Sequence, residues 1–190
     1  MSTIIALSGK MGSGKDYIAR EIIVPWIKAT GANVVTTAFA DQLKLKISAE
    51  KLVPLADMMG DKNAVTRKLL QDVGTDYRER IGTDIWIRYM ERWIELRKIR
   101  DGQQIVVITD CRYPNELEWV KSKGGVIVKI NAPDRTAARV SAENCPVLSE
   151  HHSENEITFP FDLVIDNRVE RSDDVRKIMI EFLEKLDCTK

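Results

Sequence analysis

The chain has 190 residues, which is long enough for one domain with a hydrophobic core. Its 29 basic and 29 acidic residues give a formal net charge of +0, so no overall field attracts nucleic acid or a membrane surface. The three cysteines, Cys111, Cys145 and Cys188, lack metal-ligand spacing and are typical of free thiols in a reducing compartment. No apolar run approaches the ~20 residues of a membrane span, and the first residues do not resemble a secretion signal. We therefore expect a cytoplasmic protein that binds neither nucleic acid nor membrane.

The first predicted strand, residues 3–7, is followed by the glycine-rich turn Gly9-Lys10-Met11-Gly12-Ser13-Gly14-Lys15-Asp16. A helix is predicted next, over about residues 16–26, with Pro25 ending or bending its last turn. Strand, glycine-rich turn and helix in this order are the context of a phosphate-binding P-loop, in which backbone N–H groups and the helix N-terminus face an anion. Lys15 would supply a mobile positive charge to the β- and γ-phosphates of a nucleotide.

Asp16 stands where the usual P-loop has a Ser or Thr hydroxyl for Mg²⁺. A carboxylate beside a triphosphate is repelled unless a cation lies between them, and Mg²⁺ accepts carboxylate ligands. Asp16 is therefore either a ligand of Mg²⁺, through a water, or a first-turn acid that interacts with the helix dipole. The sequence leaves both interpretations open.

The second predicted strand covers residues 33–39, and Asp41 could cap the helix that follows it. Helical character dominates over residues 65–99. Within this region the chain has Gly-Thr-Asp twice, at 74–76 and at 82–84. We expect each copy to end one helix and cap the next.

Three further strands are predicted, over residues 104–109, 126–130 and 161–165, with helices over 115–123 and from 172 onward. Strands that alternate with helices are typical of a parallel sheet covered on both faces. No linker or low-complexity tract divides the sequence, so we expect one domain over residues 1–190. The polar segment at about residues 131–156 interrupts this domain, and we interpret it as a lid over a ligand site.

Polar residues follow the predicted strands at the edge where parallel sheets hold ligands. Asp41 and Lys44 follow the second strand, and Asp110 and Arg112 follow the third. Asp110 comes after an apolar strand as a Walker-B carboxylate does, where it would hold Mg²⁺ directly or through water. The alternative is a turn or N-cap aspartate. The P-loop in the same chain favours the metal role.

Arginines matter to phosphoryl transfer because this chemistry depends on positioning and on charge stabilisation. We interpret Arg112 as functional because it follows so closely on the candidate metal ligand. Arg135 and Arg139 are four residues apart, so one helical turn of the lid segment could bring both to the transferring phosphoryl group; the alternative is a solvated surface. Trp86 could stack on a base, although an aromatic residue on a helix stripe is more often part of a core.

Several stretches, spread over almost the whole chain, occur in the order of one known family. They are Leu7-Ser8-Gly9 through Ser13-Gly14-Lys15-Asp16, Phe39-Ala40-Asp41-Gln42-Leu43-Lys44, Arg67 with Leu70-Gln71 and Gly74-Thr75-Asp76, Val107-Ile108-Thr109-Asp110-Cys111-Arg112, His151-His152-Ser153-Glu154, and Leu163-Val164-Ile165-Asp166-Asn167. In these stretches the chain resembles the phage-type deoxynucleoside monophosphate kinases, within the P-loop kinases. The P-loop alone is generic, but Ser-Gly-Lys-Asp together with Thr-Asp-x-Arg and a late Ser-Glu pair is fairly specific.

The resemblance implies Mg²⁺-dependent transfer of the γ-phosphoryl group of ATP to a (deoxy)nucleoside monophosphate. It also implies a three-layer P-loop fold with a parallel five-stranded sheet of order 2-3-1-4-5, helices on both faces and a lid. Lys15 and the P-loop amides would hold ATP, Asp110 and Arg112 would lie at the transfer centre, and Arg135 and Arg139 would act from the lid.

The same resemblance places Arg67, Gln71 and Arg78 toward the acceptor. The full set of predicted substrate-binding residues adds Asp41, Lys44, Trp86, Ser153 and Glu154. The predicted metal ligands are Asp16 and Asp110.

Animal-type phosphomevalonate kinases have very similar Ser-Gly-Lys-Asp, Asp-x-Arg and Ser-Glu elements, and they are the alternative with another acceptor. The stretch from Arg67 to Asp76 favours the nucleotide kinases. A nucleotide-switched module of the GTPase type would need an Asn-Lys-x-Asp segment, which this sequence lacks. A P-loop ATPase that acts on DNA would need a basic stripe, which it also lacks. The base preference and the oligomeric state, a homodimer included, stay open.

Overall fold

The computed structural model describes residues 3–51, 53–60, 64–133, 158–168 and 172–186. Within them, five parallel strands form one sheet of order β2-β3-β1-β4-β5. The strands are β1 (Ile4–Ser8), β2 (Val34–Thr37), β3 (Ile105–Cys111), β4 (Val126–Asn131) and β5 (Leu163–Asp166). This is the predicted order, and it places the strand before the P-loop in the centre of the sheet.

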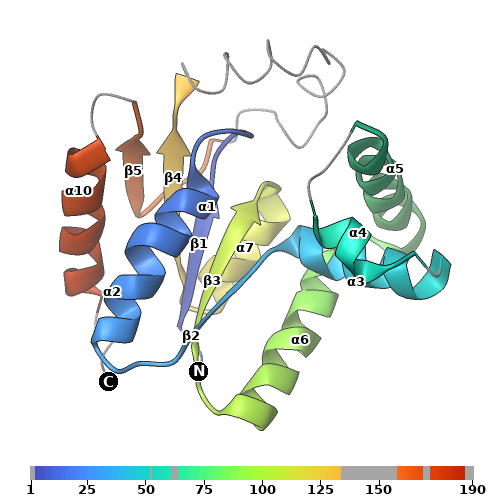
Figure 1. The fold of residues 1–190 in the computed structure, drawn as a ribbon, viewed down its shortest axis with the longest axis horizontal. Coiled ribbons are helices and arrows are strands. Elements are labelled where there is room, and N and C mark those ends of the chain that lie inside the picture. Colours follow the sequence, from blue (N-terminus) through green and yellow to red (C-terminus); the bar gives the residue numbers. More distant parts are fainter. Residues whose placement is uncertain (1–2, 52, 61–63, 134–157, 169–171, 187–190) are drawn as a thin grey trace.

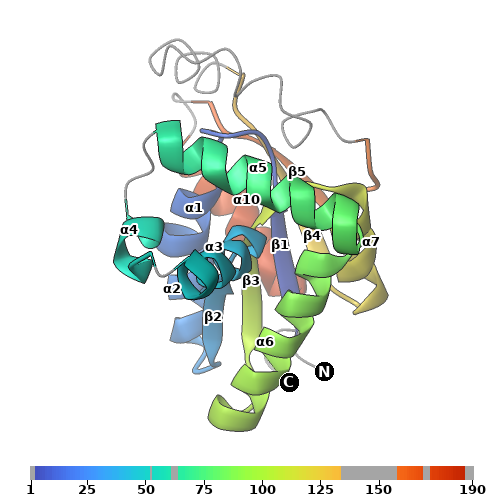
Figure 2. The same ribbon diagram turned by 90° about the vertical axis from the view of Figure 1, so that its right-hand side faces the viewer.

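Helices cover both faces of the sheet (Figures 1 and 2). One face packs against α1 (Lys15–Ile18), the π-helical segment η1 (Ala19–Ile23), α2 (Val24–Ala29) and α10 (Ser172–Lys185). The other face carries α3 (Phe39–Lys51), α4 (Leu55–Met59), α5 (Ala64–Ile81), α6 (Ile85–Asp101) and α7 (Pro114–Ser122). Among the described residues, no helix has the length and apolar character that crossing a bilayer requires.

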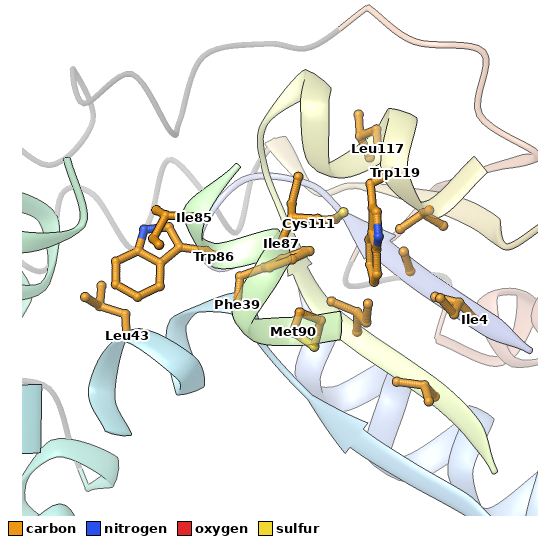
Figure 3. Packing of buried hydrophobic residues seen from close by; sticks show 14 of the residues in the cluster. Ile4, Phe39, Leu43, Ile85, Trp86, Ile87, Met90, Cys111, Leu117 and Trp119 are labelled. Atoms are coloured by element: carbon orange, nitrogen blue, oxygen red, sulfur yellow. The ribbon is translucent and has the colours of Figure 1, made fainter. Parts of the chain in front are cut away.

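Two hydrophobic cores lie on opposite faces of the sheet. Along β1, Ile5 and Leu7 belong to the core beneath the P-loop helix and α10, whereas Ile4 and Ala6 belong to the core beneath α3, α5, α6 and α7. All four side chains are buried because the central strand of a doubly covered sheet has no solvent face. Figure 3 shows part of the second core, in which Leu43, Ile85 and Trp86 bring α3 and α6 together.

The helix after the P-loop continues past Pro25, so the proline does not end it. Lys15 to Ala29 are helical without a break, as α1, η1 and α2. The wider turns of η1 come just before Pro25, which lies in the first turn of α2.

The two Gly-Thr-Asp copies have different places in the fold. Residues 82–84 join α5 to α6 as predicted, but residues 74–76 lie inside α5, contrary to prediction. A Cβ atom at Gly74 would lie 3.2 Å from Leu43 Cδ2 of α3, and the Gly74 carbonyl accepts a hydrogen bond from Trp86 Nε1 of α6 at 3.3 Å. Glycine at this position therefore allows close packing of three helices.

Candidate active site

A cavity of about 690 Å³ lies at the carboxyl ends of β1, β2 and β3, the edge of a parallel sheet at which ligands bind. One wall is formed by the P-loop and the first turns of the helix that follows it. The opposite wall comes from α3, α5, the start of α6 and α7. In Figure 1, the P-loop, the carboxyl ends of the strands and α5 all lie at the upper side of the molecule.

Most of the predicted site residues that the structure describes meet in this cavity. Those that line it are Met11, Gly12, Lys15, Asp16, Asp41, Lys44, Gln71, Arg78, Trp86, Asp110 and Arg112. Gly9, Lys10, Ser13 and Gly14 complete the P-loop without lining the cavity. Arg67 belongs to the first turn of α5, but its side chain is outside the described part. The predictions for Arg135, Arg139, Ser153 and Glu154, and for most of the 131–156 lid, also fall outside the described residues.

Glycines give the P-loop its shape. Gly9, Gly12 and Gly14 have φ angles of 146°, 82° and 90°, which side-chain-bearing residues rarely adopt. A Cβ atom at Gly9 would also lie 2.3 Å from the carbonyl oxygen of Ile130 in β4. The loop can therefore pass this close to the neighbouring strand only with glycine at position 9.

The Lys15 side chain lies along the loop that precedes it. Its Nζ donates to Gly9 O at 2.6 Å and Lys10 O at 2.8 Å, and it is 3.3 Å from Ser13 Oγ. These contacts leave the residue 6% exposed at the wall of the cavity. An ammonium group held there is placed to meet an anion bound by the loop amides.

Asn167, just after β5, connects the P-loop to the end of the neighbouring strand β4. Its Nδ2 donates to Ser13 O at 2.8 Å, and its backbone N–H donates to Asn131 O at 2.7 Å. The residue is 4% exposed, so both bonds are shielded from water. Asn167 therefore ties the P-loop to the ends of β4 and β5.

Asp110 caps α3. Its two carboxylate oxygens accept hydrogen bonds from Phe39 N at 2.7 Å and from Ala40 N at 2.9 Å. Burial raises the pKa of Asp110, against the opposing effects of the Ala40 N–H and Arg112. These contacts are those of an N-cap aspartate, which was the alternative to the metal role. Each oxygen keeps a further lone pair, so the predicted metal role is compatible with the cap and stays a prediction.

Asp41 and Lys44, which follow the second strand in the sequence, lie in α3 on the cavity wall. Lys44 Nζ donates to Asp41 Oδ1 at 2.8 Å and lies 3.7 Å from the sulfur of Met59 in α4. The lysine side chain is 10% exposed, which is low for a lysine, because it runs between two helices toward the cavity.

A second ion pair, with a buried carboxylate, lies on the wall formed by α5 and α7. Arg78 Nη2 donates to Glu116 Oε1 at 2.7 Å, and the Arg78 guanidinium stacks 3.9 Å above the Tyr113 ring. The other oxygen of Glu116 accepts from the backbone N–H groups of Arg112 at 2.8 Å and Tyr113 at 3.1 Å. Burial raises the pKa of Glu116 to about 7, although Arg78 opposes that rise.

Comparison with known proteins identifies the family. A model of the deoxynucleotide monophosphate kinases matches residues 30–142. The chain belongs to the deoxynucleotide monophosphate kinase family. A protein of Acanthamoeba polyphaga mimivirus named "Putative deoxynucleotide monophosphate kinase" is 28% identical over 149 residues, which cover 68% of this chain and 74% of that protein. Membership of this family makes the protein a phosphoryl-transfer kinase, as the resemblance of its motifs predicts.

Solved structures share the fold of this kinase over nearly its full length. The protein TT1252 of Thermus thermophilus superposes with a TM-score of 0.56 at 18% identity, covering 97% of this chain and 98% of that one. The APS kinase of Mycobacterium tuberculosis, solved with AMPPNP and APS, has a TM-score of 0.53 at 13% identity, covering 96% and 98% of the two chains. At these identities the likeness establishes the fold alone.

Trp86 of the kinase lies at the boundary between the cavity and the core. It is 2% exposed, belongs to the core shown in Figure 3, and packs between the rings of Tyr77 at 5.7 Å and Tyr89 at 5.8 Å. These surroundings match the core alternative. Stacking of Trp86 on a base stays a prediction.

Sequence reasoning missed three residues of the kinase site: Tyr113, Glu116 and Asn167. A signal existed for Glu116, because Pro114 at the first helical position and Glu116 two residues later mark a helix start. A signal also existed for Asn167, which directly follows an apolar strand in one of the family stretches. Neither signal predicts the long-range partner, Arg78 for Glu116 and Ser13 for Asn167.

Proposed function

We propose that this kinase transfers the γ-phosphoryl group of ATP to a deoxynucleoside monophosphate, with Mg²⁺ as cofactor. One observation carries the proposal: the P-loop with Lys15 and a second group of cations, Lys44, Arg78 and Arg112, line the same cavity from opposite walls. A phosphoryl-transfer enzyme with a phosphate acceptor needs two such sites that face each other, because both substrates are anionic.

The donor side follows from the loop. The amides of the P-loop and Lys15 would hold the β- and γ-phosphates, with the loop shape maintained by its glycines and by Asn167. Charge that develops between donor and acceptor would be stabilised by Lys15 and Arg112. The acceptor phosphate is itself an anionic nucleophile, so this chain does not need to supply a general base.

The donor set of the cavity fits Mg²⁺. This cation is commonly held by one or two carboxylates together with substrate phosphates and waters, and Asp16 and Asp110 both line the cavity. Within the described ranges, no group of three or more His, Cys, Asp or Glu side chains forms a self-contained metal site. When bound, Mg²⁺ would neutralise charge on the β- and γ-phosphates.

The acceptor side supports a nucleotide over a small aliphatic phosphate. Apolar side chains of Leu43, Leu70 and Trp86 line the wall made by α3, α5 and α6, and Gln71 adds an amide with both donors and an acceptor. A planar base offers a matching apolar face and a polar edge. Phosphomevalonate has no ring to cover such a wall.

The deciding experiment measures ADP release with ATP and Mg²⁺ against dAMP, dGMP, dCMP, dTMP, their ribose counterparts and phosphomevalonate. We expect turnover with at least one deoxynucleoside monophosphate and none with phosphomevalonate. Lys15→Ala should lower kcat by about 10²-fold or more. Lys28→Ala, which removes an exposed lysine at the far end of the same helical run, is the matched control and should leave turnover unchanged. Turnover only with phosphomevalonate would contradict the proposed acceptor, and no turnover at all would contradict the proposed reaction.

A further inference from the structure

A buried carboxylate in a cavity for two phosphate-bearing substrates needs a physical reason, because its charge repels both of them. Glu116 is such a group: it lines the cavity and is 2% exposed. Its oxygens accept three hydrogen bonds, from the Arg78 side chain and from the backbone N–H groups of Arg112 and Tyr113. The carboxylate therefore contacts both arginines that line this wall.

Arg78 is held on several sides. Glu116 binds one of its terminal nitrogens, the Tyr113 ring supports one face of the guanidinium, and Gly74 leaves room beside Nη1, 3.9 Å from where a Cβ would lie. The Nε donor of Arg78 is buried and, among the described residues, has no hydrogen-bond partner. A guanidinium carries five N–H donors, and the contact with Glu116 involves only Nη2. Arg78 also lines the cavity, so an anion bound there lies next to this guanidinium.

We propose that Glu116 is a positioning residue, which fixes Arg78 and the backbone at Arg112 in the orientation that binds the phosphate of the acceptor. The inference rests on the proposed function and extends it to a residue that touches neither substrate. A free arginine loses rotamer entropy when it becomes fixed, and a partner that fixes it beforehand removes that loss from binding.

The two oxygens of Glu116 have separable tasks. Oε2 caps the start of α7, a task that the amide oxygen of glutamine also performs. Oε1 faces the Arg78 donor, where the NH₂ of a glutamine would place donor against donor. Glu116→Gln thus preserves the helix start and removes the contact with Arg78.

The test uses the full chain and the deoxynucleoside monophosphate that the wild type phosphorylates best, at pH 8, where Glu116 is mostly ionised. We expect Glu116→Gln to raise the acceptor KM by about tenfold or more, as expected when a charged hydrogen bond is lost, with the ATP KM within about twofold of wild type. The matched control is Glu118→Gln on the exposed side of α7, which should change neither KM.

A double-mutant cycle with Arg78→Ala separates positioning from a general structural effect. If Glu116 acts through Arg78, Glu116→Gln causes no further rise in acceptor KM once Arg78 is absent. If the single variant does not fold, Glu116→Asp replaces it: the charge is kept, but the shorter side chain cannot reach Arg78 and cap α7 together. The same rise in acceptor KM is then expected.

The outcomes separate this inference from the proposed function. Two results would overturn the positioning role: an unchanged acceptor KM in Glu116→Gln, or the same rise in acceptor KM whether or not Arg78 is present. Wild-type turnover would still support the kinase in either case. Absence of wild-type transfer to every nucleoside monophosphate would overturn both.

Discussion

Lys15, Lys44 and Arg78 each lie against a fixed partner on the cavity wall. Lys15 contacts carbonyls of the P-loop, Lys44 contacts Asp41, and Arg78 contacts Glu116. A side chain whose rotamers are already restricted loses less conformational entropy when it binds a ligand. At the scale of single residues, the cavity is therefore preorganised for anions.

Asn167 offers a test of this preorganisation on the nucleotide side. Asn167→Ala removes the hydrogen bond to Ser13 O and leaves that buried carbonyl without its side-chain donor. We expect the ATP KM to rise about five- to tenfold, in line with about 1 kcal/mol for one buried hydrogen bond, with the acceptor KM unchanged. The measurement is initial-rate kinetics with each substrate varied in turn. Arg168→Ala, which removes the exposed partner of Asp166, is the control. A rise in acceptor KM alone would contradict the assignment.

Motifs predict residues whose role is local, and they miss residues whose role depends on a distant partner. The P-loop residues could be named from their spacing because strand, turn and helix are consecutive in the chain. Ser13 and Asn167 are separated by 154 positions, and Arg78 and Glu116 by 38. No pattern within one stretch encodes such a contact, so the sequence predicts Arg78 without the carboxylate that holds it.

At the scale of elements, α3 begins where Asp110 accepts the N–H groups of its first residues, from a strand 71 positions away. Asp110→Asn leaves a single oxygen for two donors, so we expect a loss of about 1–2 kcal/mol in the free energy of unfolding. Urea unfolding measures this loss, with Asp72→Asn on the exposed side of α5 as control. Unchanged stability would show that the cap contributes nothing.

The same variant addresses the predicted metal role. If Asp110 also holds Mg²⁺, Asp110→Asn should have two effects. The free energy of unfolding should fall, and the Mg²⁺ concentration for half-maximal turnover should rise. A change in stability with an unaltered Mg²⁺ requirement would leave Asp110 with the capping role alone.

The helices and strands themselves were largely predictable, because alternation of apolar strands with helices determines a parallel sheet. The errors occur at residues with two possible meanings. Pro25 is a helix breaker in isolation, yet the helical run continues through it to Ala29, with wider π-helical turns just before it. Gly-Thr-Asp is typical of a helix end, yet the close approach of Leu43 favours a small residue at position 74, inside α5. Tertiary packing decided the case of Gly74.

At the scale of the whole molecule, Glu116 makes stability depend on pH. Its pKa is raised from 4.5 to about 7, so between these values the folded chain keeps a proton that the unfolded chain has lost. The contribution of Glu116 to the free energy of unfolding is therefore largest below pH 4.5 and falls as pH rises to 7, by on the order of 3 kcal/mol. Asp110, whose pKa is also raised, adds to the same trend.

Urea unfolding of wild type and Glu116→Gln from pH 4.5 to 8 isolates this effect. As pH rises through this range, the free energy of unfolding of the wild type should fall relative to that of the variant, because glutamine does not titrate. A constant difference would show that the pKa of Glu116 is the same in the folded and unfolded chains.

The sheet separates two hydrophobic cores, and each core supports a different wall of the cavity. The P-loop helix packs into the core that also holds α10, whereas α3, α5 and α6 pack into the core on the opposite face. Substitutions that reshape the wall beside Leu43, Leu70 and Trp86 therefore repack one core and leave the support of the P-loop intact. Natural selection could exchange one phosphate acceptor for another in such a scaffold through inherited changes on a single face, without rebuilding the half that binds the phosphate donor.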